Sequence, residues 1–335
     1  MKKNILHLEN LIEGYILTCR AEAKSPNTVQ WYGDFLRLFL HLLQKFHCPL
    51  IITEINKEHI RLVIRYLQSE ARTRRNGQPL SPSTIQGFVR TIKAFFSWLE
   101  REDYVNFNPM SKIKIPKVPT KVLETFSSDH ISHLLDVFRR SDKTGYRNTA
   151  IVLLLLDTGL RISELIGLEV GDLDLVSGNI KVRITKGSKE RIVPVGSVVQ
   201  RVLWRYIQQH RPEPAISSIK RVFLNDDGLP LTGNGVAQML RRNCSRAGIS
   251  GVRCSPHTLR HTFSKNYLLN GGDIFSLQKI LGHSSLASVR IYVNLFAGDV
   301  KQQHLRFSPA DTMCQKNGLY SLLRHSRQSS PSSNK

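Results

Sequence analysis

Residues 255–263 read SPHTLRHTF, and this stretch places a histidine and an arginine one helical turn apart. A proline in the first turn is typical of a helix N-terminus, and residues three apart share one helix face. Such an N-terminus presents free backbone N–H groups and a partial positive charge, which together favour an anion. We therefore expect a helix over 256–270 whose first turn directs His257 and Arg260 toward one anionic ligand.

Further motifs lie on both sides of this stretch, and each contributes one polar side chain of its own. They are TGLRISEL (158–165) with Arg161, ITKGSKERIVPV (184–195) with Lys186, LGHSS (281–285) with His283 and VRIYVN (289–294) with Tyr292. An arginine fork binds two phosphate oxygens and keeps its charge, and a tyrosine hydroxyl can attack phosphorus. The combined set suits cleavage of a phosphodiester, with Tyr292 as the attacking group.

Each of these residues also has an ordinary structural explanation when it is taken alone. Arg161 could form a helix-end salt bridge with Glu164, and Tyr292 could belong to the core. His283 could cap a helix, and Lys186 could be solvated at the tip of a hairpin. The occurrence of the whole set, in order and in one basic chain, favours a shared site.

A metal site is a competing explanation for the histidines of the predicted helix. His257 and His261 are four residues apart and could face one ion. The segment does not read HExxH, and no carboxylate or cysteine pair stands nearby at ligand spacing. The sequence therefore predicts no metal and no other cofactor.

The charge of the chain is strongly unbalanced. Its 335 residues include 48 Lys and Arg against 26 Asp and Glu, which gives a net charge of +22. Such an excess favours a polyanionic partner, most often nucleic acid, although a basic surface can also serve solubility. The five cysteines are scattered without a CxxC pair, so a disulfide framework or a zinc ribbon is not expected.

The sequence also predicts a soluble, cytoplasmic protein associated with the nucleoid. Polar residues interrupt the first segment, so it does not resemble a signal peptide. The longest purely apolar run covers only residues 150–156, far short of the roughly 20 needed to span a bilayer.

Residues 1–106 carry the pattern of a bundle of four helices. Helix-start residues precede three of the apolar segments, namely Ser25-Pro26, Thr53 with Asn56, and Ser81-Pro82. The apolar residues recur at helical spacing over 6–16, 29–43, 60–67 and 85–99. We expect these residues to form a small helical domain.

Residues 107–123, FNPMSKIKIPKVPTKVL, contain three prolines and four lysines and predict a basic, semi-rigid linker. The residues over 124–307 predict a mainly helical domain with one small β-hairpin over 180–195, tipped by Lys186. Its expected helices are 129–139 with Ser128 as cap, 146–157, 162–168, 197–210, 233–247, 256–270, 273–281 and 285–291. The Ser-, Gln- and Arg-rich end, residues 308–335, is expected to be disordered. The fold class is therefore mainly α with a small β-sheet, an α+β second domain.

Taken together, the motifs over residues 127–300 resemble those of the tyrosine recombinases, also called phage-type integrases. The likeness is greatest to the Xer-like group and to the integrases of mobile elements. Residues 1–106 resemble, more weakly, the helical core-binding domain of the same family. The resemblance implies a site-specific recombinase that cuts and rejoins DNA for integration, excision or resolution.

The resemblance also implies roles at the matching positions. Tyr292 would form a 3′-phosphotyrosine bond, and Arg161 and Arg260 would bind the scissile phosphate. Lys186 would protonate the 5′-oxygen leaving group, with Lys189 as the competing choice because the preceding turn varies in length.

For the remaining positions, the resemblance implies that His257 acts as acid/base and hydrogen-bond partner and that His283 binds a phosphate oxygen. Glu164 would support the region around Arg161. No metal or ATP would be needed, since the phosphotyrosine bond conserves the energy of the broken ester.

The family picture further implies a C-shaped clamp around double-stranded DNA and a tetramer of this chain on two paired sites. The segment after Tyr292, residues 294–307, would pack on a neighbouring protomer, and accessory or directionality proteins could take part. Three other readings compete: a type IB-like topoisomerase or telomere resolvase, a DNA-binding regulator without catalysis, and a zinc-dependent nuclease.

Overall fold

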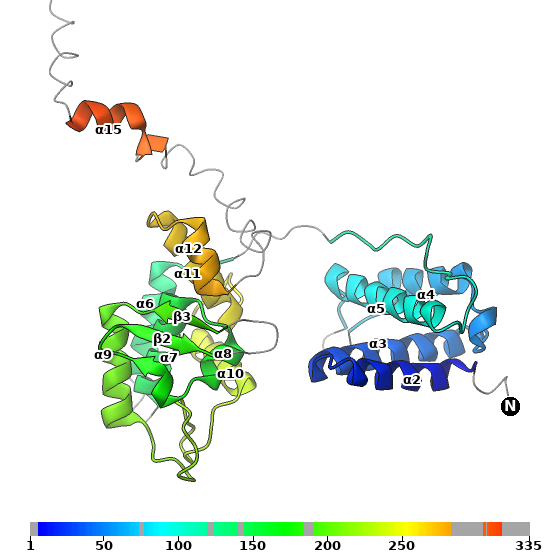
Figure 1. The fold of residues 1–335 in the computed structure, drawn as a ribbon, viewed down its shortest axis with the longest axis horizontal. Helices are drawn as coiled ribbons and strands as arrows, with labels where there is room; N and C mark the ends of the chain where they lie inside the picture. The colour runs from blue at the N-terminus through cyan, green and yellow to red at the C-terminus, as the bar shows by residue number, and fades with distance from the viewer. Residues whose placement is uncertain are drawn as a thin grey trace, which may run out of the picture. The chain divides into compact units, whose positions relative to one another are not determined.

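The computed structural model describes residues 6–73, 77–118, 124–139, 144–183, 190–282, 304–305 and 307–316. The chain divides into two compact units, residues 1–121 and 122–335 (Figure 1). Each unit has its own hydrophobic core, one built from residues between Leu8 and Ile113 and the other from residues between Phe126 and Leu259.

The first unit is a bundle of four α-helices, as the sequence predicts. The helices are α2 (Leu8–Ala21), α3 (Pro26–Lys45), α4 (Lys57–Ser69) and α5 (Pro82–Arg101), with a short turn η1 (Ile52–Glu54) before α4. α3 packs against α2, α4 and α5, and α4 also packs against α5. The shared core is rich in aromatic rings, because Phe39, Phe88 and Phe96 are fully buried between these helices.

Side-chain caps explain where three of these helices begin. The Oγ atoms of Ser25 and Ser81 accept hydrogen bonds from the backbone N–H groups three residues later, at 3.0 and 3.2 Å. The side chain of Asn56 accepts from two backbone N–H groups at the start of α4. These contacts satisfy N–H groups that the helix itself leaves free, so the predicted helix starts are confirmed.

The segment predicted as a linker packs onto the first unit over much of its length. Met110 is fully buried and Ile113 is 7% exposed. Gln86 of α5 donates from Nε2 to the carbonyl oxygen of Pro116 at 2.8 Å. The expectation that residues 107–123 are all linker is therefore wrong up to Pro116, because buried apolar side chains alternate with the lysines along the segment.

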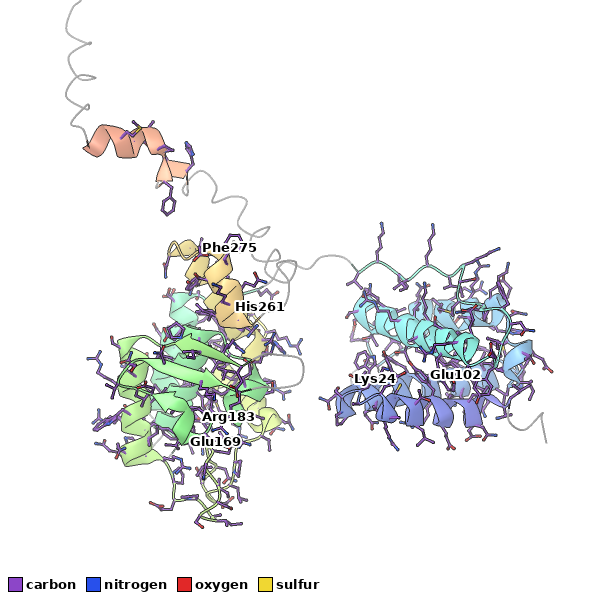
Figure 2. All side chains as sticks on the ribbon, in the orientation of Figure 1. Lys24, Glu102, Glu169, Arg183, His261 and Phe275 are labelled. Atoms are coloured by element: carbon purple, nitrogen blue, oxygen red, sulfur yellow. The ribbon has the colours of Figure 1, made fainter. Side chains whose placement is uncertain are left out.

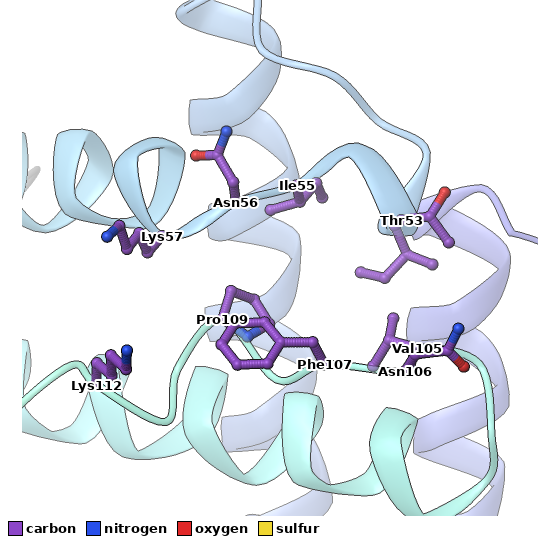
Figure 3. A pocket seen from close by; sticks show the side chains of 10 residues that line it. Thr53, Ile55, Asn56, Lys57, Val105, Asn106, Phe107, Pro109 and Lys112 are labelled. Atoms are coloured by element: carbon purple, nitrogen blue, oxygen red, sulfur yellow. The ribbon is translucent and has the colours of Figure 1, made fainter.

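A hollow of about 480 Å³ lies in this unit between the start of α4 and residues 105–112 (Figure 3). Its lining includes Asn56, Lys57, Phe107, Pro109 and Lys112. It contains none of the residues that the sequence analysis singles out as candidate site residues.

The second unit is mostly helical around one buried helix. Its helices are α6 (Ser128–Arg139), α7 (Gly145–Thr158), α8 (Ile162–Gly167), α9 (Ser197–Arg205), α10 (Gly233–Arg246), α11 (Pro256–Leu269) and α12 (Ile274–Leu281). A 3₁₀ turn η2 (Val170–Asp172) follows α8, and a π-helical turn η3 (Tyr206–His210) continues α9. α7 packs against α6, α9 and α11, which explains the continuous apolar run over its residues 150–156. The predicted helices within the described residues are confirmed to within about two residues at their ends, except that η3 replaces the last turn of the helix expected over 197–210.

A small antiparallel sheet accompanies these helices, in the order β1 (Leu173–Asp174), β2 (Asn179–Val182) and β3 (Arg191–Pro194). The predicted hairpin is confirmed at its base, where Val182 pairs with Arg191. The expected tip with Lys186, and the competing Lys189, lie outside the described residues. The two-residue strand β1 was not predicted, because it is too short to show a period of alternation.

Two local expectations need correction. Ser127, not Ser128, caps α6, since its Oγ accepts from the N–H of His130 at 3.1 Å. Within the segment expected to be disordered, a helix α15 spans Pro309–Lys316. Pro309 leads this helix and Ser308 accepts from the N–H of Asp311 at 3.3 Å, so local start signals outweigh the polar composition there. Over the described ranges, no helix is both long and apolar enough to cross a bilayer.

Candidate active site

The end of α7 brings the first arginine into position. Gly159 ends α7 with φ +60°, a left-handed conformation that favours glycine, and the chain then enters α8 through Arg161. The backbone N–H of Arg161 donates to Oε2 of Glu164 at 2.8 Å, and its Nη1 donates to Oε1 at 3.0 Å. The salt bridge weighed from the sequence is therefore present, yet the Arg161 side chain remains 32% exposed.

The second arginine, Arg260, lies one turn into α11 and is only 4% exposed. Its Nη1 donates to the carbonyl oxygen of Gly159 and its Nη2 donates to the carbonyl oxygen of Leu281 at 2.9 Å. Arg260 thus joins the end of α7 to the end of α12.

Three successive carbonyl oxygens at the end of α12 each accept from a different arginine. Nε of Arg191 donates to Ile280 at 2.8 Å, and Nη2 of Arg260 donates to Leu281 at 2.9 Å. Nη2 of Arg161 donates to Gly282 at 3.4 Å. The last carbonyls of a helix lack partners within the helix and carry partial negative charge, so cations are favourable there. This arrangement gathers guanidinium groups from α8, β3 and α11 at one place.

His257 joins this group from the first turn of α11, where Ser255 caps the helix by accepting from the N–H of Thr258 at 3.2 Å. Partial desolvation lowers the pKa of His257, and the positive charges of Arg260, Arg253 and Arg161 lower it further. The imidazole is accessible at the surface, and its neutral form is favoured at pH 7. Two arginines and one histidine predicted from the sequence therefore lie close together.

Comparisons with known proteins give the family of this chain. Two family models match, the phage integrase family over residues 124–298 and the phage integrase N-terminal SAM-like domain over 12–103. The tyrosine recombinase XerD of Staphylococcus aureus is 31% identical over 304 residues, which cover 90% of this chain and 99% of that protein. The chain belongs to the phage integrase family. It is a tyrosine recombinase, an enzyme that cleaves and rejoins DNA in site-specific recombination.

Other similar proteins agree with this membership. The XerD recombinase of Staphylococcus haemolyticus is 32% identical over 304 residues, 90% of this chain and 99% of that protein. The Tn1549 transposon integrase in complex with a circular intermediate DNA has a TM-score of 0.68 at 22% identity, covering 84% of this chain and 94% of that chain. The XerH recombinase bound to its difH substrate, after cleavage, has a TM-score of 0.66 at 20% identity, with 87% and 82% covered. These structures support the fold of the recombinase.

A further arginine of the recombinase, Arg191, is part of the site although the sequence analysis did not single it out. Its Nη1 and Nη2 donate to Oε1 and Oε2 of Glu164, each at 2.9 Å. Burial alone would raise the pKa of Glu164, but hydrogen bonds and charges from Arg191 and Arg161 outweigh burial and hold that pKa below its usual range. A sequence signal existed, because strand alternation places Arg191 on the same face as the buried Val193.

The remaining candidate residues of the recombinase, Lys186, His283 and Tyr292, lie outside the described residues. His261, the second histidine weighed as a metal ligand, sits half-buried on α11 (Figure 2), and burial is the main cause that lowers its pKa. No group of three or more His, Cys, Asp or Glu side chains suited to a metal ion occurs in the part of the chain that the structure describes.

Proposed function

We propose that this recombinase cleaves one strand of duplex DNA through Tyr292, within a site formed by Arg161, Lys186, His257, Arg260 and His283. The Tyr292 hydroxyl oxygen attacks the scissile phosphorus, and the bond from phosphorus to the 5′-oxygen breaks. The products are a 3′-phosphotyrosine and a free 5′-hydroxyl. Rejoining reverses the step, when a 5′-hydroxyl attacks the phosphotyrosine and releases the tyrosine.

The observation that carries this proposal is the meeting of Arg161 and Arg260 at the end of α12, with His257 on the same helix face as Arg260 in the first turn of α11. Arg161 and Arg260 donate to consecutive carbonyl oxygens, so their guanidinium groups are near neighbours. Attack on a phosphodiester concentrates negative charge on the non-bridging oxygens, and paired guanidinium groups stabilise that charge. A phosphate that bound here would accept hydrogen bonds from the guanidinium groups that now donate to the carbonyl oxygens at the end of α12.

Proton movements are assigned to the other residues. His257 is a suitable acceptor for the Tyr292 proton, because desolvation, and then the surrounding positive charge, lower its pKa and favour its neutral form. Lys186 donates a proton to the 5′-oxygen as it leaves, and His283 donates a hydrogen bond to a phosphate oxygen. The resemblance assigns these last two roles.

The reaction needs neither a metal ion nor ATP in this proposal. Two arginines and a lysine provide the positive charge that a metal would otherwise supply. The phosphotyrosine bond keeps the energy of the broken ester, so rejoining requires no further energy source.

The proposal extends to the assembly. The helical first unit and the second unit both bind the duplex, in keeping with a net charge of +22, and four protomers act on two paired sites. Solved relatives described as bound to DNA, such as the Tn1549 integrase and XerH, support this partner. The corresponding location is the cytoplasm, on the chromosome, with accessory or directionality proteins as further partners.

Removal of the guanidinium groups tests the proposal. Arg161→Ala and Arg260→Ala should each lower the rate of strand cleavage by about two to three orders of magnitude, since each removes about 3–4 kcal/mol of transition-state stabilisation. The matched control is Arg139→Ala, because the Arg139 side chain on α6 is 79% exposed and forms an ion pair with Asp136 of the same helix. Cleavage is measured in a single turnover on a nicked duplex that the wild-type protein captures. Near-normal cleavage by either variant would refute the proposed site.

A further inference from the structure

We infer that Arg191 is a positioning residue for strand cleavage, holding the end of α12 and the base of the β2–β3 hairpin in register with Arg161. This inference rests on the proposed function for its catalytic consequence. Its structural part, the ordering of α12 by Arg191, can be tested without DNA.

The contacts of Arg191 leave it little capacity for a phosphate. Its two terminal nitrogens bind both oxygens of Glu164 at 2.9 Å, and its Nε binds the carbonyl oxygen of Ile280 at 2.8 Å. The side chain is only 10% exposed, whereas that of Arg161 is 32% exposed. Arg191 therefore acts through its neighbours and not by contact with DNA.

The position of Arg191 in the fold connects three segments that carry proposed catalytic groups. Arg191 begins β3 opposite Val182, at the base of the hairpin, five residues after Lys186. It donates to the Glu164 carboxylate, which also accepts a hydrogen bond from Arg161. Through Ile280 it holds the last turn of α12, which leads directly to His283 in the sequence.

Gly282 shows how closely Arg191 fits against the end of α12. This glycine has φ +62°, in the left-handed region that other residues rarely adopt. A Cβ atom added there would lie 2.9 Å from Nη1 of Arg191 and 3.0 Å from its Cζ. The backbone conformation therefore favours glycine before His283, and a Cβ atom there would also displace the guanidinium group of Arg191.

Charge gives Arg191 a second effect on the site. Glu164 is buried with a side-chain exposure of 0%, and it faces two guanidinium groups, those of Arg191 and Arg161. Arg191 binds both carboxylate oxygens and balances the charge of Glu164. The positive charge of Arg161 therefore remains available to the phosphate. Without Arg191, the buried carboxylate would have Arg161 as its main counter-ion and would draw it away from the phosphate.

The test compares Arg191→Lys with Arg183→Lys. A lysine keeps the charge but cannot reach both oxygens of Glu164 and the Ile280 carbonyl together. Arg183 is the matched control, because it lies on the opposite arm of the same hairpin and binds Asp172 at 2.7 Å and Glu169 at 3.0 Å (Figure 2). Both of these partners lie before β2 in the chain and outside α12.

Hydrogen–deuterium exchange of the free protein is the first readout. Arg191→Lys should speed exchange of the amides of residues 280–282 by about tenfold or more, with the helices of the first unit unchanged. Single-turnover cleavage of the captured nicked duplex is the second readout. It should slow by about 10- to 100-fold, while the dissociation constant for the DNA stays within about twofold. Arg183→Lys should match the wild type in both readouts.

Three results would overturn the inference: unchanged exchange at the end of α12, cleavage within about twofold of the wild type, or an equal loss of cleavage in Arg183→Lys. If Arg191→Lys does not fold, Glu164→Asp replaces it, because the shorter carboxylate keeps its charge but withdraws from Arg191. That variant should show the same local exchange and loss of cleavage. Absence of cleavage by the wild type would instead refute the proposed function, and exchange would still decide whether Arg191 orders α12.

Discussion

At the scale of single residues, His257 offers a pH-dependent prediction. Its pKa lies below 6.5, first because of desolvation and then because of the charges of Arg260, Arg253 and Arg161. In the unfolded chain the imidazole binds its proton at a higher pH. The contribution of His257 to stability is therefore present above that unfolded pKa and is lost as pH falls through the folded pKa.

Arg253→Ala removes one of these charges and should raise the pKa of His257 toward 6.5, while Arg139→Ala should leave it unchanged. The measurement is an NMR titration of the ring resonances, assigned with a His257→Asn variant. A wild-type pKa at or above 6.5, or no response to Arg253→Ala, would contradict the electrostatic account of the site.

The sequence predicted part of the site residue by residue and missed part. The motifs singled out Arg161, His257 and Arg260 as candidates, and the structure brings them close together. His257 and Arg260 share a helix face because they lie three residues apart. Their roles in cleavage stay predictions. Arg191 was missed because its role depends on Glu164 and Ile280, which are distant in sequence and meet only in the folded unit. The burial of Arg260 could not be predicted from the sequence either, because it depends on how α7, α11 and α12 pack together.

At the scale of elements, the end of α12 should tolerate added side-chain volume poorly. Gly282→Ala should destabilise the protein by about 1–2 kcal/mol, because an alanine in the left-handed region is strained. Contact of the new methyl group with Arg191 adds to this cost. Urea unfolding at pH 7 measures the change, with Gly171→Ala as control, since a Cβ at Gly171 meets no atom within 4 Å and no left-handed φ is required there. Equal stability of Gly282→Ala and the wild type would contradict the described end of α12.

Most of the elements themselves could be predicted, because their start signals are local. Ser25, Asn56 and Ser81 cap helices as expected, and Gly159 ends one. Predictions from the sequence fail where tertiary contacts determine the structure of a segment or where an element is very short. Residues 107–116 pack on the core of the first unit through Met110 and Ile113, which composition alone did not reveal, and β1 has only two residues.

At the scale of the whole molecule, the net charge of +22 predicts strongly salt-dependent DNA binding. Lysines and arginines that meet phosphates release counter-ions, so the association constant should fall by on the order of 10³ or more between about 50 and 200 mM salt. Fluorescence anisotropy with a labelled duplex measures this dependence. An association constant that hardly changes over this range would contradict a phosphate-dominated interface.

The segment beyond residue 298 carries a second prediction at this scale. Because the family picture has it pack on a neighbouring protomer, deleting residues 298–335 should abolish strand exchange and spare binding to one DNA site. Gel-shift and recombination assays on the same preparation separate the two activities. Unchanged strand exchange by the truncated chain would refute the predicted contact between protomers.

The central claim is that Tyr292 forms a covalent bond to DNA, and covalent capture in cells tests it most directly. Wild-type protein, Tyr292→Phe and the control Tyr267→Phe, which removes the hydroxyl of a tyrosine packed on Phe263, are expressed with the native DNA. After denaturation, the DNA that remains bonded is sequenced and the modified peptide is identified by mass spectrometry. We predict adducts at one short, repeated site in the wild type and in Tyr267→Phe, with the nucleotide on Tyr292. Adducts that persist in Tyr292→Phe, or their absence from a wild-type protein that still binds DNA, would contradict the account.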